Sequence, residues 1–360
     1  MYYHVLLTRR CNLNCIYCGG SEESYSDPEI QYNLEDLLKF MEKDSEPVIA
    51  FYGGEPLLRI PLMERIMDTI PARYYILQTN GCFLEGVGVD YLKRFHSIVT
   101  SIDGREDTTD HYRGEGVYRR VLDSVKLVRD RGYQGDIIAR MVISENSDVY
   151  EDVTHLLKLE NPTFDHVHWQ LDVIWSKEGE WQNFDDWISN SYNPGISKLV
   201  KNWYEEMQTN RKVQGIVPFI PVMRTLLTGE KSSLWCGSGI DFFAIHPSGK
   251  ITVCPISPDP EFVVGDIWNS HPLELWNSMR VGAPCPECEV YWVCGGRCLY
   301  ANMKKHWGEE GFAKVCETVK HLIRELEEVK PKIVELIKKE VVSLKEFDYP
   351  EINNCCEIIP

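Results

Sequence analysis

Short apolar runs rich in β-branched and aromatic residues alternate with amphipathic segments through the first half of the chain. The runs predicted as strands cover residues 2–7, 48–52, 74–79, 98–102, 136–143 and 166–174. Between them lie helical patterns such as 34–43, with Asn33 as a cap, and 117–131, which ends at Gly132. This alternation is typical of βα units around a parallel sheet, so we expect an α/β fold built on a partial (β/α)6 barrel.

Three cysteines follow the first predicted strand, in the segment Cys11-Asn12-Leu13-Asn14-Cys15-Ile16-Tyr17-Cys18. In parallel βα folds the chemistry lies at the carboxyl ends of the strands, where this loop falls. Three thiolates on one loop can each bind an iron of a 4Fe-4S cluster, which leaves the fourth iron open. The alternatives are a redox pair or a zinc site. Zinc normally takes a fourth nearby Cys or His, and the close candidate, His4, lies within the predicted strand.

This spacing, with Tyr17 directly before the third cysteine, resembles the motif of the radical S-adenosylmethionine (radical SAM) enzymes. The resemblance implies that Cys11, Cys15 and Cys18 hold a 4Fe-4S cluster whose open iron binds SAM. It further implies reductive cleavage of SAM to a 5′-deoxyadenosyl radical.

The segment Phe51-Tyr52-Gly53-Gly54-Glu55-Pro56 after the second predicted strand resembles the GGEP motif of the same family. There, Gly53, Gly54 and Glu55 would meet the SAM amino group, and glycine is needed because the backbone approaches the ligand closely. An ordinary turn is the alternative.

Other strand ends also resemble family motifs. By this resemblance Ser101 and Arg113 would hold the SAM ribose and carboxylate, while Tyr17 and Leu171 would flank the adenine. Arg113 could instead be a surface charge and Leu171 a core residue. The motif residues Asn80 and Asp103 could simply cap the helices that follow them, and His111, His168 and Asp172 are further candidates near strand ends.

A second set of cysteines surrounds a predicted hairpin at 242–253, and its members are Cys236, Cys254, Cys285, Cys288, Cys294, Cys298 and Cys316. Their order resembles the SPASM domain, the auxiliary-cluster extension of radical SAM enzymes that modify peptides and proteins. The resemblance implies one cluster held by Cys285, Cys288, Cys294 and Cys316 and another held by Cys236, Cys254 and Cys298, hence three 4Fe-4S clusters in all. A pair of zinc ribbons is the alternative.

The second auxiliary set has three ligands, because the segment 227–231 lacks the further cysteine of fully ligated relatives. Cys82, Cys355 and Cys356 remain unassigned. The last two could close the cluster from the tail or be free surface thiols, and we favour an open iron. An open iron could bind a substrate cysteine, on which carbon-radical attack would form a thioether.

The expected organisation has four parts. Residues 1–182 form the radical SAM partial barrel and 183–235 a helical bridge, interrupted at Pro194-Gly195. Residues 236–318 form the cysteine-rich SPASM domain, a β-hairpin plus loops and a helix. Residues 319–360 form a helical tail and C-terminal extension, with helical spacing over 321–347 interrupted by Pro331.

Bulk properties limit the partners. The chain has 360 residues, a formal charge of −17 and a sequence pI near 5.1, which disfavour nucleic acid. No apolar run approaches the roughly 18 residues of a membrane span, and no signal peptide precedes the first strand, so we expect a cytoplasmic protein. Thirteen cysteines then indicate metal or cluster ligation rather than disulfides.

The resemblance implies an enzyme that modifies a residue of a ribosomal peptide or protein, by thioether or other oxidative crosslink formation. A reducing partner such as ferredoxin or flavodoxin would supply electrons. Sulfatase maturation is disfavoured because Pro255 follows Cys254, where those enzymes carry an acidic residue. Two alternatives stay open: a radical SAM enzyme acting on a small molecule or cofactor precursor, and a non-catalytic iron–sulfur electron carrier.

Overall fold

The computed structural model describes residues 1–19, 28–174, 181–257, 259–353 and 357–360. Cys355 and Cys356, which the sequence leaves without a role, lie outside the described residues. The chain divides into two compact units. The first comprises Met1–Ile102, Asp110–Ile138 and Cys236–Arg280, and the second Asp103–Thr109, Ala139–Trp235 and Val281–Pro360.

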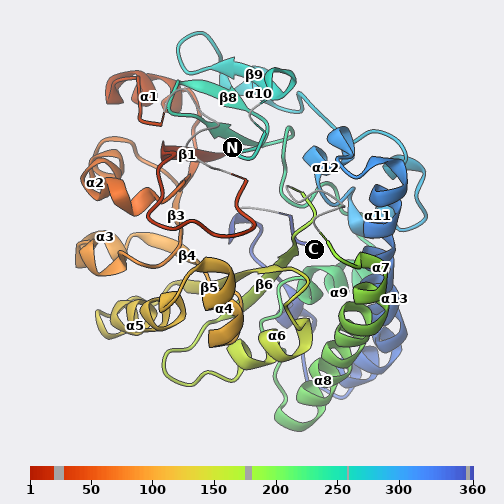
Figure 1. The fold of residues 1–360 in the computed structure, drawn as a ribbon. Coiled ribbons are helices and arrows are strands. Elements are labelled where there is room, and N and C mark those ends of the chain that lie inside the picture. The colour runs from red at the N-terminus through yellow and green to blue at the C-terminus, as the bar shows by residue number, and fades with distance from the viewer. Residues whose placement is uncertain (20–27, 175–180, 258, 354–356) are drawn as a thin grey trace. The chain divides into compact units, whose positions relative to one another are not determined.

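A sheet runs through the chain with the strand order β6-β5-β4-β3-β2-β1-β7-β8-β9 and does not close. Within the first unit, its neighbouring strands β3 and β4 lie side by side (Figure 1). In the first unit its parallel strands are β1 (Tyr2–Thr8), β2 (Val48–Gly53), β3 (Tyr74–Thr79), β4 (Phe95–Ser101) and β7 (Phe242–Ile245). Six of the seven residues of β1 are buried, as expected for a parallel strand covered on both faces. The predicted α/β class with an open barrel is confirmed.

After β7 the chain forms β8 (Lys250–Thr252), which pairs antiparallel with β7, and then β9 (Val263–Asp266), which pairs antiparallel with β8. The helices of the first unit are α1 (Leu34–Met41), α2 (Ile60–Thr69), α3 (Val89–Leu92), α5 (Val117–Asp130) and α10 (Pro272–Leu275). Helix α4 (Glu106–Arg113) begins in the second unit and ends in the first. Asn33 caps α1 as predicted, because its side chain accepts the Asp36 N–H.

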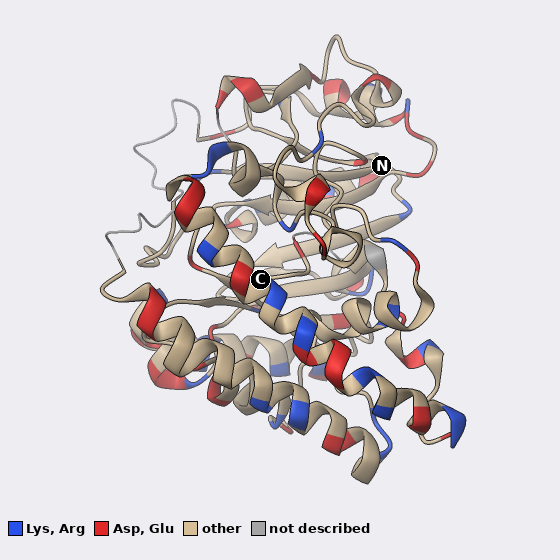
Figure 2. Ribbon diagram, turned by 90° about the vertical axis from the view of Figure 1, so that its right-hand side faces the viewer, with Lys and Arg blue, Asp and Glu red and all other residues tan. Residues whose placement is uncertain are grey.

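The second unit holds most of β5 (Asp136–Ile143), together with β6 (His166–Leu171) and α6 (Val149–Leu157). Its remaining helices are α7 (Phe184–Trp187), α8 (Asn193–Asn210), α9 (Phe219–Thr228), α11 (Tyr291–Cys294), α12 (Leu299–Lys304) and α13 (Gly308–Lys338). Helix α13 packs against α8 and α9. Charges of both signs alternate along this long helix, so it presents no basic stripe (Figure 2).

Several predicted boundaries were wrong. Strand β4 begins at Phe95 rather than residue 98, and β6 ends at Leu171 rather than residue 174. Pro194 follows a π-helical turn at Ile188–Tyr192, and α8 continues past it to Asn210, so it does not interrupt that helix. Pro331 lies inside α13, which continues to Lys338, and strand β9 was not predicted.

Candidate active site

The loop that follows β1 carries the first three cysteines in the first unit. Cys11 and Cys18 are exposed and Cys15 is half-buried, so all three thiols can be reached by a cofactor. The Cys18 N–H donates to the Cys15 carbonyl at 3.0 Å, and the Ile16 N–H donates to the Tyr112 carbonyl at 2.9 Å. These bonds fix a tight turn around the second and third cysteines.

The two glycines after β2 allow the chain to lie directly against this loop. The Gly54 N–H donates to the Thr8 carbonyl at 2.9 Å, and the Glu55 N–H donates to the Arg10 carbonyl at 2.8 Å. A Cβ on Gly54 would lie 2.2 Å from the Arg10 carbonyl oxygen. Any side chain there would therefore separate the Glu55 segment from the cysteine loop.

Glu55 is fully buried and accepts three hydrogen bonds. Oε1 accepts the Leu57 N–H at 2.9 Å and the Thr79 hydroxyl at 2.7 Å, and Oε2 accepts the Asn80 N–H at 2.7 Å. Burial raises the pKa of Glu55 to about 7, although these bonds act in the opposite direction. The carboxylate is held rigidly and would become more stable as an anion beside a cation.

Asn80 connects Glu55 to the cysteine loop. Its side-chain amide donates to Asn12 Oδ1 at 2.8 Å and lies 3.7 Å from Cys11 Sγ, and its Oδ1 accepts the Cys82 N–H at 3.0 Å. Asn80 therefore contacts the first thiol in addition to making a local turn. Thr79 and Asn12 also belong to this network. The sequence assigned neither a role, although Thr79 lies in the strand-end segment Gln78-Thr79-Asn80-Gly81 and Asn12 in the three-cysteine motif.

Arg113 is buried, so it is not a surface charge. Its guanidinium lies over the Tyr17 ring, 5.5 Å from the centroid, and Tyr17 also packs against Tyr112 at 5.5 Å. The structure thus brings a cation and two aromatic rings to the end of the cysteine loop. Ser101 ends β4 in the same unit. The roles of Tyr17, Ser101 and Arg113 toward SAM stay predictions.

Most of the other candidates lie in the second unit. Leu171 is buried at the end of β6, and Asp172 accepts the Ser144 hydroxyl at 3.0 Å. Asp103 accepts the Val142 N–H at 2.9 Å, which ties it to β5 and explains its burial by a structural role. His168 is buried on β6, and His111 packs edge-on against Tyr112 in the first unit.

In the first unit, Cys236 and Cys254 flank the hairpin of β7 and β8. A hydrogen-bonded chain runs from the cysteine loop to this hairpin. Arg9 donates to His246 Nδ1, so Nε2 carries the proton and donates to the Thr252 hydroxyl at 2.7 Å, which donates to the Cys254 carbonyl at 2.7 Å. Arg9, His246 and Thr252 therefore connect the segment before Cys11 to the backbone of Cys254.

In the second unit, four thiols lie near one another. Burial raises the pKa of Cys294 to about 12 and of Cys316 to about 11, and each is raised further by the charge of Cys285. Cys288 acts in the same direction on Cys285 and Cys316. Separate segments thus bring together the four cysteines predicted to hold one auxiliary cluster.

The placement of the described thiols offers no site for a single metal ion. Among the residues that the structure describes, no group of three or more His, Cys, Asp or Glu is placed to bind one metal ion. A zinc ion would need its thiolates about 2.3 Å from a single point. In a cubane each thiolate binds a different iron, so the thiols need not meet at one point. The zinc alternatives therefore gain no support from the geometry.

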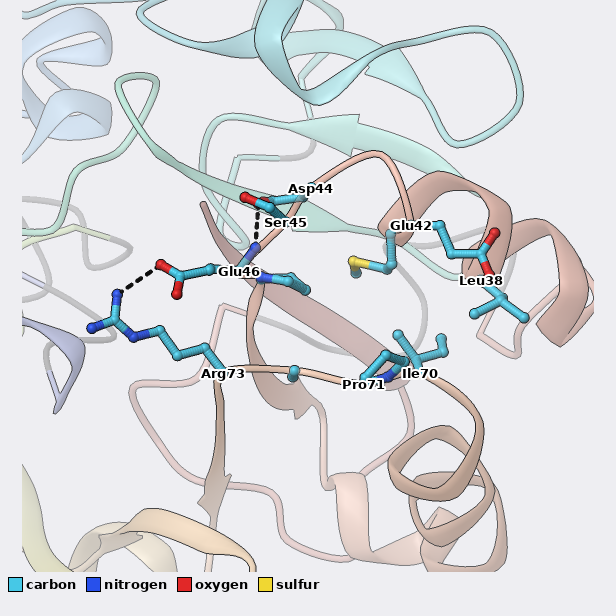
Figure 3. Close-up of a pocket in the computed structure, with 11 residues that line it drawn as sticks. Leu38, Glu42, Asp44, Ser45, Glu46, Ile70, Pro71 and Arg73 are labelled. Carbon is cyan, nitrogen blue, oxygen red and sulfur yellow. Dashed lines mark hydrogen bonds and ion pairs between the residues drawn. The ribbon is translucent and has the colours of Figure 1, made fainter.

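A pocket elsewhere in the first unit is not a competing site. It is lined by Leu38, Met41, Glu42, Asp44, Ser45, Glu46, Pro47, Ile70, Pro71, Ala72 and Arg73 (Figure 3). Pro47 and Arg73 directly precede β2 and β3, so the pocket lies at the amino-terminal edge of these strands, opposite the cysteine loop. Arg73 is already paired with Glu46 at 3.1 Å.

Residues 5–157 match a family model described as the Radical SAM superfamily. The chain is 24% identical to an AdoMet-dependent heme synthase of Methanosarcina barkeri over 81% of this chain and 88% of that protein. Its fold is similar to that of anSMEcpe with bound AdoMet, with a TM-score of 0.75 at 19% identity over 94% of this chain and 96% of that one. It is also similar to Streptococcus suis SuiB bound to the precursor peptide SuiA, with a TM-score of 0.55 at 15% identity over 84% and 72% of the two chains.

The family match covers the strands and loops that carry the three-cysteine motif, the Gly53-Gly54-Glu55 segment and Arg113. Among the described helices, none combines the length and apolar character that crossing a bilayer requires. Residues 5–157 of this chain therefore match the radical SAM superfamily.

Proposed function

We propose that this radical SAM enzyme modifies a residue of a ribosomal peptide or protein, by forming a thioether or another oxidative crosslink. The observation that carries the proposal is the extent of the fold similarity. It continues past the radical SAM domain to 94% of the chain, in a neighbour that has also been solved with a bound peptide. The cysteine-rich part of the chain is thus included in the similarity.

The first unit supports SAM binding through its own side chains. The rigid Glu55 carboxylate suits a ligand amino group, and the Arg113 guanidinium suits a carboxylate. When bound, the cluster and SAM would supply an electron and a 5′-deoxyadenosyl radical that abstracts hydrogen from the substrate. The role of the protein is to position the substrate bond and exclude water.

We further propose two auxiliary 4Fe-4S clusters, one held by Cys285, Cys288, Cys294 and Cys316 and one by Cys236, Cys254 and Cys298. Forming a crosslink removes two hydrogens from the peptide. One becomes the new hydrogen of 5′-deoxyadenosine, and the other leaves as a proton together with one electron. An auxiliary cluster could accept that electron and pass it on to ferredoxin or flavodoxin.

A second candidate is a radical SAM enzyme that acts on a small molecule or cofactor precursor. The sequence similarity to an AdoMet-dependent heme synthase favours it, because that similarity also covers 81% of the chain. The two candidates share the SAM site and differ in the substrate, so the substrate experiment must separate them.

The first experiment tests SAM cleavage. Anaerobically reconstituted protein is mixed with SAM and dithionite, and 5′-deoxyadenosine is quantified by liquid chromatography. Wild-type protein should produce it, whereas the C11A/C15A/C18A variant should not. A fully loaded wild-type protein that produces none would indicate an electron carrier instead.

The second experiment tests the substrate class by mass spectrometry. Peptides encoded beside the gene are incubated with enzyme, SAM and reductant, and a porphyrin precursor is tested in parallel. Loss of two hydrogens from a peptide supports crosslinking. SAM-dependent conversion of the porphyrin with no change in any peptide would favour the second candidate.

A further inference from the structure

Arg297 is a buried cation that forms no ion pair among the described residues. It is 6% exposed and lies between Gly296 and Cys298, with a positive φ of 53°. Its Nε and Nη2 atoms are buried and have no hydrogen-bond partner in the part of the chain that the structure describes. A guanidinium stays charged at any ordinary pH, and leaving one buried and unpaired is strongly destabilising. Its surroundings therefore require an anion.

The Arg297 charge acts on Tyr192 and on four cysteines. The Arg297 charge acts on Cys285, Cys294, Cys298 and Cys316, and in each case it opposes the burial that raises the thiol pKa. Neutral thiols would leave the guanidinium uncompensated. Thiolates bound to iron would supply negative charge and sulfur acceptors beside it.

A protein carboxylate does not fill this role. The charge of Glu357 raises the pKa of the Cys298 thiol, but across the described residues no ion pair joins Glu357 to Arg297. The Glu357 Oε1 atom is itself buried without a hydrogen-bond partner in that part of the chain. Arg297 and Glu357 therefore form no direct ion pair, and an anion that binds Arg297 would come from another group.

We propose that Arg297 is a positioning residue that donates its Nε and Nη2 hydrogens to sulfur atoms of the cluster held by Cys285, Cys288, Cys294 and Cys316, and so raises the reduction potential of that cluster. The inference rests on the proposed function, since it assumes that this cluster is present. Reduction adds one negative charge to the cluster, and hydrogen bonds to sulfur stabilise that charge. The cluster would then accept an electron more readily.

The test is a redox titration followed by low-temperature electron paramagnetic resonance (EPR). It uses the full chain with C11A/C15A/C18A, so that only auxiliary clusters contribute, and dithionite as reductant. R297M removes charge and donors, whereas R297K keeps the charge and loses the two-pronged geometry. At a fixed potential, the ratio of reduced to oxidised cluster should fall roughly tenfold or more in R297M and less in R297K. R224M is the matched control, because Arg224 is paired with Asp348 in the same unit, and should keep the original ratio.

An unchanged ratio in fully loaded R297M would overturn the inference. If R297M fails to hold iron, a loaded R297K with a lowered ratio supports it. If R297K also loses the cluster, the inference is overturned, because such a result is explained by a purely structural need for the arginine. Absence of any auxiliary cluster from the C11A/C15A/C18A protein with Arg297 intact would contradict the proposed function itself.

Discussion

Glu55 is a carboxylate whose charge depends on what lies next to it. In the protein alone, burial raises its pKa to about 7. A cationic SAM amino group would favour the ionised form, so binding should become tighter as pH rises toward and past 7. Between pH 6 and pH 7.5 we expect the affinity for SAM to rise roughly tenfold, measured by isothermal titration calorimetry on reconstituted protein.

The control is E55Q, which keeps a side chain of the same size without the titrating group. It should bind SAM more weakly at every pH, with little pH dependence over the same interval. An equally steep pH dependence in E55Q would show that another group is responsible.

His246 has the opposite relation to pH. Burial lowers its pKa to about 3, and the charges of Arg9 and Lys250 act in the same direction. The unfolded chain has an ordinary histidine pKa of about 6.5, so it binds the proton first as pH falls. Stability from this site is therefore present above pH 6.5 and is lost progressively toward pH 3, by about 1.4 kcal/mol at pH 5.5.

This prediction is checked by urea unfolding under reducing, anaerobic conditions at pH 7.5 and pH 5.5. H246Q should lose about 1 kcal/mol less than wild type between the two values. H271N is the comparison, because His271 only caps the short helix α10. An identical pH response in wild type and H246Q would rule out His246 as the source.

At the scale of elements, the contact between the cysteine loop and the Gly53-Gly54-Glu55 segment depends on backbone proximity. In G54A the new methyl group would collide with the Arg10 carbonyl, so the segment must move and Glu55 with it. We expect SAM affinity to fall at least tenfold, as measured by calorimetry. In G229A the added methyl meets open space, although φ is +75°, so that variant should lose only about 1 kcal/mol of stability and bind SAM normally.

Helix α13 contains a proline that opposes its continuation. Pro331 is exposed and lies within the helix, where it removes one backbone hydrogen bond. The apolar residues on either side, Val329 and Ile333, are buried, and their burial keeps the helix intact. P331A should raise the free energy of unfolding by about 1–3 kcal/mol, seen as a higher midpoint in thermal unfolding. A lower midpoint would mean that the proline fits a local bend that alanine does not.

The sequence predicted most strands of the fold but not the continuity of helix α13 or the presence of strand β9. Hydrophobic periodicity predicted the strands well, because residues buried on both faces of a parallel sheet form continuous apolar runs. Proline was read by its local preference, and the prediction of a break at Pro331 was wrong because tertiary packing outweighs that preference. Strand β9 was missed because four residues with no full burial give little periodic signal.

At the scale of the whole molecule, the cysteine order carried most of the information. The motif at Cys11–Cys18 led to the radical SAM superfamily, which the comparison confirms over residues 5–157. The sequence alone could not identify which other residues support the cysteines in the fold. Thr252 and Arg297 belong to ordinary sequence contexts, and their positions become informative only when His246 and the buried thiols are placed around them.

We propose that Cys11, Cys15 and Cys18 hold a 4Fe-4S cluster with an open iron that binds SAM. It is tested most directly by low-temperature EPR of the dithionite-reduced, reconstituted protein, recorded with and without SAM. We predict a cluster signal whose g-values change when SAM is added, and no such change in C11A/C15A/C18A. A signal that SAM leaves unaltered in the wild-type protein, at full iron content, would contradict the claim.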